Sequence, residues 1–72
     1  MVRSVILVRA PKTLASSKVR GIEGVVDAFD VSGRFDAVVL IEGKDLTKLK
    51  EAVLKIQGIK GVRRTETLVE VP

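Results

Sequence analysis

The chain has 72 residues, 46% of them hydrophobic and 31% charged, and 13 basic against 9 acidic residues give a net charge of +4. This length predicts one domain over residues 1–72, and the apolar fraction excludes a disordered chain. There is no run of about 18 apolar residues and no secretory signal at the start, so we expect a cytoplasmic protein with no membrane partner. The absence of Asn and Cys also favours a heat-adapted source.

Cys and His are both absent, which removes whole classes of chemistry. Disulfides, iron–sulfur clusters, ordinary zinc sites and Ser-His-Asp or Cys-His catalysis are excluded, and we expect no metal, no cofactor and no enzymatic activity. The remaining enzyme hypothesis rests on Asp27, Asp30 and Asp36. Strand alternation places Asp27 and Asp30 on opposite faces, which argues against a shared catalytic site.

The charge pattern does not favour nucleic acid as a direct partner. The longest basic run is Arg63-Arg64, and there is no basic tail. The aromatic residues are Phe29 and Phe35 alone, too few for the base-stacking sheet of RNA-binding domains.

The first half of the chain predicts a strand, a helix and a hairpin. Val2 to Arg9 is apolar and β-branched, which is typical of a strand, and Pro11 follows its end. Thr13 to Arg20 predicts a helix. Val25 to Val31 and Asp36 to Glu42 predict two strands close enough to pair as a hairpin.

The second half predicts a helix followed by a strand. Asp45 is suited to be an N-cap, and Gly58 to end the helix. Between them, apolar residues recur on one helical face: Leu46, Leu49, Val53 and Ile56. Val62 to Val71 predicts the fourth strand. The order β-α-β-β-α-β predicts an α+β, ferredoxin-like fold, with an antiparallel four-stranded sheet of order 4-1-3-2 and two helices on one face.

A short repeat supports this duplicated architecture. Gly21-Ile22-Glu23-Gly24-Val25 recurs as Gly58-Ile59-Lys60-Gly61-Val62, 37 positions later. In both copies the segment falls between a predicted helix and a predicted strand. Each copy therefore predicts a helix-ending glycine, a buried isoleucine, a turn glycine and a strand-opening valine.

The two central strands are apolar on both faces, while two helices can cover only one face of the sheet. A chain of this size also gains little stability from a single core and has no disulfide or metal to help. We therefore expect a homodimer in which the uncovered sheet faces oppose each other.

Two segments resemble the effector domain of the Lrp/AsnC regulator family. Residues 31–36, Val-Ser-Gly-Arg-Phe-Asp, are similar to its V-T-G-x-Y/F-D turn. Lys55-Ile56-Gln57 and residues 61–68 are similar to its K-I-Q…G-V-x-x-T-x-T-L stretch. The resemblance runs from about Ile22 to Val71, and it departs from the family regulators in that 72 residues leave no room for a helix-turn-helix domain. The chain resembles a stand-alone effector domain.

The resemblance implies paired-sheet dimers assembled into rings of four or five dimers, with an amino-acid effector held between dimers. It also implies association with full-length regulators of the family as a further option. The implied ligand-binding residues lie in two segments: Gly33, Arg34, Phe35, Asp36, Gln57 and Thr65. In this interpretation amides near Gly33 hold the carboxylate, Asp36 holds the α-ammonium, and Arg34 or Phe35 sets the side-chain preference.

Each of these residues also has an ordinary structural interpretation. Gly33 serves a hairpin turn, Phe35 a core or dimer contact, and Asp36 the turn amides. Gln57 and Thr65 are typical of a helix surface and a strand. The alternative function is a scaffold or decoy that mixes with partner regulators and binds no small molecule.

Overall fold

The computed structural model describes residues 1–11 and 18–71. Four strands form one sheet: β1 (Val2–Arg9), β2 (Val25–Asp30), β3 (Ala37–Gly43) and β4 (Arg64–Val69). One helix, α2 (Leu46–Gln57), connects β3 to β4. Most of the helix predicted from Thr13 to Arg20 lies outside the described residues, and Lys18 and Val19 at its end are helical.

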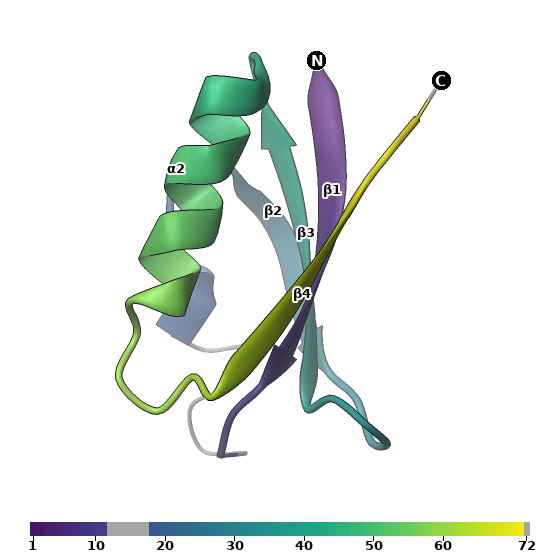
Figure 1. The fold of residues 1–72 in the computed structure, drawn as a ribbon, viewed down its shortest axis with the longest axis vertical. Coiled ribbons are helices and arrows are strands. Elements are labelled where there is room, and N and C mark those ends of the chain that lie inside the picture. Colours follow the sequence, from purple (N-terminus) through teal and green to yellow (C-terminus); the bar gives the residue numbers. More distant parts are fainter. Residues whose placement is uncertain (12–17, 72) are drawn as a thin grey trace.

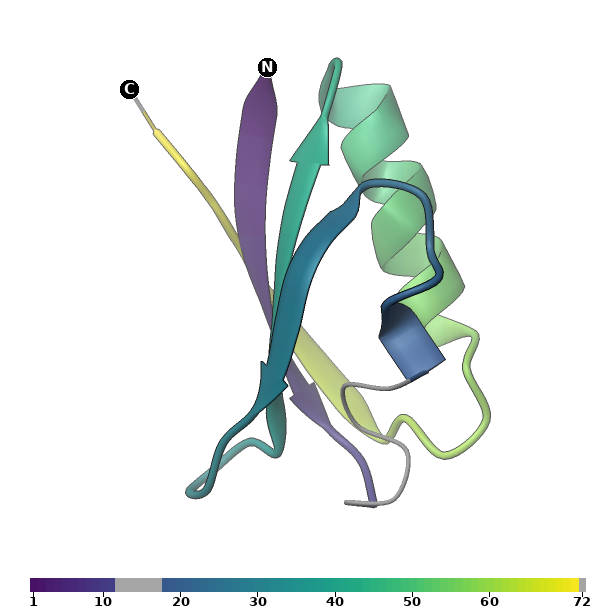
Figure 2. The ribbon, with the colours of Figure 1, turned by 180° about the vertical axis from the view of Figure 1, so that it is seen from behind.

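The predicted topology is confirmed, because the strands lie in the order β2-β3-β1-β4 and all neighbours are antiparallel. β1 and β3 form the centre, with Val5 opposite Leu40 and Leu7 opposite Val38. Helix α2 lies along one side of the sheet, and the other side is left open by the described residues (Figures 1 and 2). Both termini lie at one end of the sheet, and the β2–β3 turn and the end of α2 lie at the other (Figure 1).

The strand ends differ from prediction where the chain enters turns. β2 ends at Asp30 rather than Val31, and β3 begins at Ala37 rather than Asp36. β4 begins at Arg64 rather than Val62, because the amide of Val62 closes a turn on the carbonyl of Ile59 at 3.1 Å.

The repeat forms the same turn twice. The amides of Ile22 and Ile59 bond the carbonyls three residues before them, both at 3.1 Å, and the amides of Val25 and Val62 do the same, again at 3.1 Å. The second glycine has a positive φ in each copy, 99° at Gly24 and 101° at Gly61. The predicted helix-ending glycine needs no such conformation, since Gly58 has φ −80°. The glycine requirement of the repeat therefore lies at its fourth position.

Helix α2 begins where predicted, because the Oδ1 of Asp45 accepts a hydrogen bond from the amide of Lys48 at 3.0 Å. Its buried side chains are Leu49, Ala52 and Ile56. Leu46, which the sequence places on the same apolar face as Leu49 and Ile56, is 57% exposed. Leu46 is the first helical residue and lies at the end of the α2–sheet contact. Ala52 is buried instead, although its small side chain makes it inconspicuous in the apolar pattern of the sequence.

The core lies between α2 and the covered sheet face. It contains alternate residues of the central strands together with the helix residues: Ile6, Val8, Ala10, Val19, Ala28, Ala37, Val39, Ile41, Leu49, Ala52 and Ile56. The residues between them point to the open face, where Val5, Leu7, Val38 and Leu40 are half-buried and Phe29 and Leu68 are exposed. The doubly apolar centre predicted from the sequence is therefore present, with one face uncovered by the described residues.

Candidate functional site

The turn between β2 and β3 is held in place by its backbone. The amide of Val31 donates to the carbonyl of Asp36 at 2.9 Å, and the amide of Asp36 donates to the carbonyl of Val8 at 2.8 Å. Gly33, at the tip, has φ 130°, a region that is almost closed to other residues, and a Cβ there would meet nothing within 4 Å. Gly33 is thus required for backbone conformation, as its structural interpretation predicts.

Asp36 connects the turn to the end of the central strand. Its Oδ2 accepts a hydrogen bond from the amide of Ala10 at 3.0 Å, just after β1 ends. Ala10 is 5% exposed, so this bond satisfies a donor in a buried segment. The carboxylate of Asp36 therefore has a structural role across the sheet, rather than within its own turn, and it also lines a small pocket of about 280 Å³ shared with Arg9 and Arg63.

Gln57 and Thr65 lie together but on the helix side of the sheet. The Nε2 of Gln57 donates to the Oγ1 of Thr65 at 3.1 Å, joining the end of α2 to the start of β4. Thr65 lies opposite Val8, and Val8 lies opposite Ala37, so Thr65 is two strand spacings, about 10 Å, from the turn.

The six predicted residues thus gather at one end of the molecule in two groups. The first is the turn, Gly33 to Asp36, and the second is the Gln57–Thr65 pair. Within a single chain they do not surround one pocket. Arg34 and Phe35 line a pocket on the open face, Asp36 lines its smaller neighbour, and Arg9 lines both.

Sequence reasoning included Arg34 but missed Arg9 and Arg64, which lie beside it. The first of these pockets has a volume of about 430 Å³ and is lined by Arg9, Arg34, Phe35, Arg64 and Glu66. Arg9 also fixes the turn, because its Nη1 donates to the carbonyl of Arg34 at 2.5 Å. The available signal was the Arg63-Arg64 pair followed by Glu66 in an alternating strand, but its proximity to Arg9 depends on the β1–β4 pairing.

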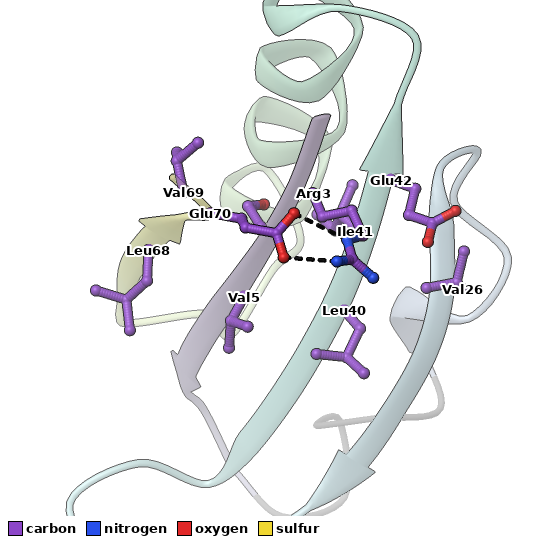
Figure 3. A pocket seen from close by; sticks show the side chains of 10 residues that line it. Arg3, Val5, Val26, Leu40, Ile41, Glu42, Leu68, Val69 and Glu70 are labelled. Carbon is purple, nitrogen blue, oxygen red and sulfur yellow. Dashed lines mark hydrogen bonds and ion pairs between the residues drawn. The ribbon is translucent and has the colours of Figure 1, made fainter. Parts of the chain in front are cut away.

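The opposite end of the open face carries an ion pair above apolar side chains. Arg3 contacts Glu70 through two hydrogen bonds, Nε to Oε1 at 3.0 Å and Nη2 to Oε2 at 2.6 Å (Figure 3). These hydrogen bonds between the two side chains lower the pKa of Glu70 and raise the pKa of Arg3. Beside the pair a shallow hollow of about 440 Å³ is lined in part by Val5, Leu40 and Leu68 (Figure 3).

Within residues 1–11 and 18–71, no group of three or more acidic side chains is placed to hold a metal ion. In the same part of the chain, no helix has the length and apolar character needed to cross a membrane.

Comparison with protein families gives a match over residues 6–71 to the Lrp/AsnC ligand binding domain. Among curated proteins, the homocitrate synthase of Sulfolobus acidocaldarius is 41% identical over 46 residues, which is 64% of this chain and 10% of that enzyme. The homocitrate synthase of Sulfurisphaera tokodaii is 33% identical over 55 residues, 76% of this chain and 12% of the enzyme. The chain therefore corresponds to about a tenth of the length of these enzymes.

Solved structures give the same fold over the whole chain. TTHA0845 from Thermus thermophilus has a TM-score of 0.92 and 28% identity, covering 100% of this chain and 95% of its own. AsnC of Escherichia coli has a TM-score of 0.86 and 21% identity, covering 99% of this chain and 51% of its own. A transcriptional regulator of Neisseria meningitidis, in complex with L-methionine, has a TM-score of 0.83 and 17% identity, covering 99% of this chain and 50% of its own. The last two show the fold alone, within proteins about twice as long.

Proposed function

This chain belongs to the family of Lrp/AsnC ligand-binding domains, and we propose from that premise that it is an effector domain that binds an amino acid and acts through its assembly. The observation that carries the proposal is the family match, which extends over residues 6–71 and so includes every predicted site residue. The L-methionine bound by the Neisseria meningitidis regulator supports the same ligand class.

The ligand site we propose is centred on the turn. The backbone at Gly33 is exposed, and its φ of 130° is a turn conformation, so we propose that the turn amides bind a carboxylate. Asp36 uses Oδ2 for the amide of Ala10, which leaves Oδ1 for the α-ammonium of the ligand. Gln57 and Thr65 lie on the other face. We therefore propose that these two residues are supplied to the site by a neighbouring chain.

Self-association follows from the open face. Val5, Leu7, Val38 and Leu40 form a continuous apolar centre across β1 and β3, flanked by exposed Phe29 and Leu68. A second copy placed face to face would remove these side chains from water at no cost in unpaired backbone groups. We propose this dimer, assembled into rings of four or five dimers, as the form that binds the amino acid between dimers.

Native mass spectrometry with and without a panel of the twenty amino acids tests the proposal. We expect a mass that is an even multiple of one chain, and one amino acid that is retained and shifts the distribution of assemblies. A single unchanging assembly with no retained amino acid would instead support the scaffold or decoy function.

The homocitrate synthase matches favour a second candidate partner. A segment 41% identical to 46 residues of this chain is part of an enzyme, rather than of a DNA-binding protein. The domain here would then act on an enzyme by binding to it, instead of on a full-length regulator. Pull-down with the separately expressed enzyme and regulator of the same source organism distinguishes the two partners.

A further inference from the structure

Three arginines meet at the turn end of the open sheet face. Arg9 and Arg64 lie directly opposite each other in the β1–β4 ladder, and so project from the same face. Arg34 joins them from the β2–β3 turn, where its carbonyl accepts the hydrogen bond from Arg9. Together with Phe35 and Glu66 they line the 430 Å³ pocket, which we call the arginine pocket. It lies toward the turn, beyond the apolar centre that the proposed dimer would bury, and so at the edge of that contact.

This arrangement is costly without an anion. Like charges directly opposite each other on adjacent strands destabilise a sheet. None of the three guanidiniums forms an ion pair with a residue in the described part of the chain, where the ion pairs are Arg3–Glu70, Arg20–Asp27 and Lys48–Glu51. Glu66 is the one acidic residue of the pocket lining, which leaves a formal charge of +2.

We propose that the arginine pocket binds a small dicarboxylate, and that the effector is therefore an acidic amino acid. This inference rests on the proposed function for the amino-acid class and adds the side chain. Guanidinium groups bind carboxylates through paired hydrogen bonds, and two carboxylates balance the charge of +2. Arg9 lines both this pocket and the smaller one that contains Asp36, so the two are neighbours. We place the ammonium group at Asp36, the α-carboxylate at the turn amides beside Arg34, and the side-chain carboxylate between Arg9 and Arg64.

Titration calorimetry on the whole chain tests the inference with glutamate, glutamine and glutarate. Glutamine removes one negative charge at nearly the same size, and glutarate keeps both carboxylates but lacks the ammonium group. We expect glutamate to bind at least tenfold more tightly than glutamine, and glutarate to bind between them, because it loses only the contact with Asp36.

The variant Arg64→Gln removes one arginine from the pocket, and Lys44→Gln is its control, since exposed Lys44 lies just after β3 at the opposite end of the sheet. We expect Arg64→Gln to weaken glutamate binding at least tenfold and to leave glutamine binding unchanged. Lys44→Gln should leave both unchanged. Without ligand, Arg64→Gln should raise the melting temperature because the repulsion from Arg9 is relieved, whereas an arginine with a purely structural role would lower it.

Equal affinity for glutamate and glutamine, or equal effects of Arg64→Gln and Lys44→Gln, would overturn the dicarboxylate inference and leave the proposed function standing. Binding of glutarate with no binding of any amino acid would keep the arginine pocket and remove the proposed function. If Arg64→Gln and Arg34→Gln dissociate the assembly while glutamate gives no heat, the arginines serve a protein contact and the inference is wrong.

Discussion

Gly33 and Gly21 differ in one property, which makes them a matched pair. At both positions an added Cβ would meet nothing within 4 Å, but only Gly33 has a positive φ. We expect Gly33→Ala to lower the free energy of unfolding by about 1–3 kcal/mol through backbone strain. Gly21→Ala should leave it unchanged or raise it by about 0.4–1 kcal/mol, because the unfolded chain loses freedom. Urea unfolding of both variants measures the difference, and equal effects would contradict the assigned role of φ.

Asp36 has a structural and a proposed ligand role that two substitutions separate. Asp36→Asn keeps an oxygen acceptor for the amide of Ala10, while Asp36→Ala leaves that buried donor unpaired. We expect Asp36→Ala to lower the free energy of unfolding by about 1–3 kcal/mol and Asp36→Asn by less than half as much. Both should lose amino-acid binding in calorimetry, because neither retains the charge that pairs with the ammonium. Binding retained by Asp36→Asn would leave only the structural role.

At the scale of single residues, the sequence predicted the turn better than the pocket. Gly33 and Asp36 lie three positions apart in one recognisable motif, so their joint position could be read from the chain. Arg9, Arg34 and Arg64 come from three separate segments and meet only through strand pairing and one hydrogen bond. Their spacing in sequence carries no signal of that contact.

The helices and strands were predictable where the spacing of apolar residues and the capping residues indicate the same boundaries. β1 follows its apolar run from Val2 to Arg9, and α2 begins after its N-cap Asp45. The identity of the helix core was less visible, because Ala52 is buried and Leu46 exposed, which reverses the order of their hydrophobicity. Which of these two residues is buried depends on where α2 crosses the sheet, and that crossing is determined by tertiary packing rather than by local sequence.

The free energy of unfolding should depend on pH through the Arg3–Glu70 pair, which connects β1 to the residue after β4. The pKa of Glu70 is lowered in the folded chain, chiefly by its hydrogen bonds to Arg3, so the pair stabilises the fold above the ordinary pKa of a glutamate and loses this effect as pH falls through the lowered value. We expect the stability difference between wild type and Glu70→Gln to be constant from about pH 6 to 8 and to shrink below about pH 4.5. Thermal unfolding across pH measures it.

The matching variant for this pair is Arg3→Gln, alone and combined with Glu70→Gln. If the two side chains act through each other, the double variant should be more stable than the sum of the two single effects predicts, whereas additive effects would mean that they act independently. The side chains of Arg3 and Glu70 are 59% and 50% exposed. About 1 M salt should therefore reduce the stability difference between wild type and Glu70→Gln. A difference that persists in acid would indicate a packing effect of Glu70 instead.

For the whole molecule, we expect the open face to determine whether the chain acts alone. Leu68 on β4 is 52% exposed on this face beside Val5, and Leu54 on α2 is 66% exposed outside it. We expect Leu68→Lys to prevent the proposed dimer and leave single chains, because pairing the faces would bury an unpaired ammonium group. Leu54→Lys, an equal change in charge and shape, should keep an assembly mass that is an even multiple of one chain.

Sedimentation equilibrium at micromolar concentration checks the masses of both variants, and circular dichroism checks that each remains folded. The unequal result is expected because the described residues leave the apolar centre of the sheet face uncovered, and the burial that would stabilise the proposed dimer would make a charge there costly. Dissociation of Leu54→Lys with an intact Leu68→Lys dimer would place the contact on the helix side. A wild type that sediments as one chain would overturn the proposed dimer.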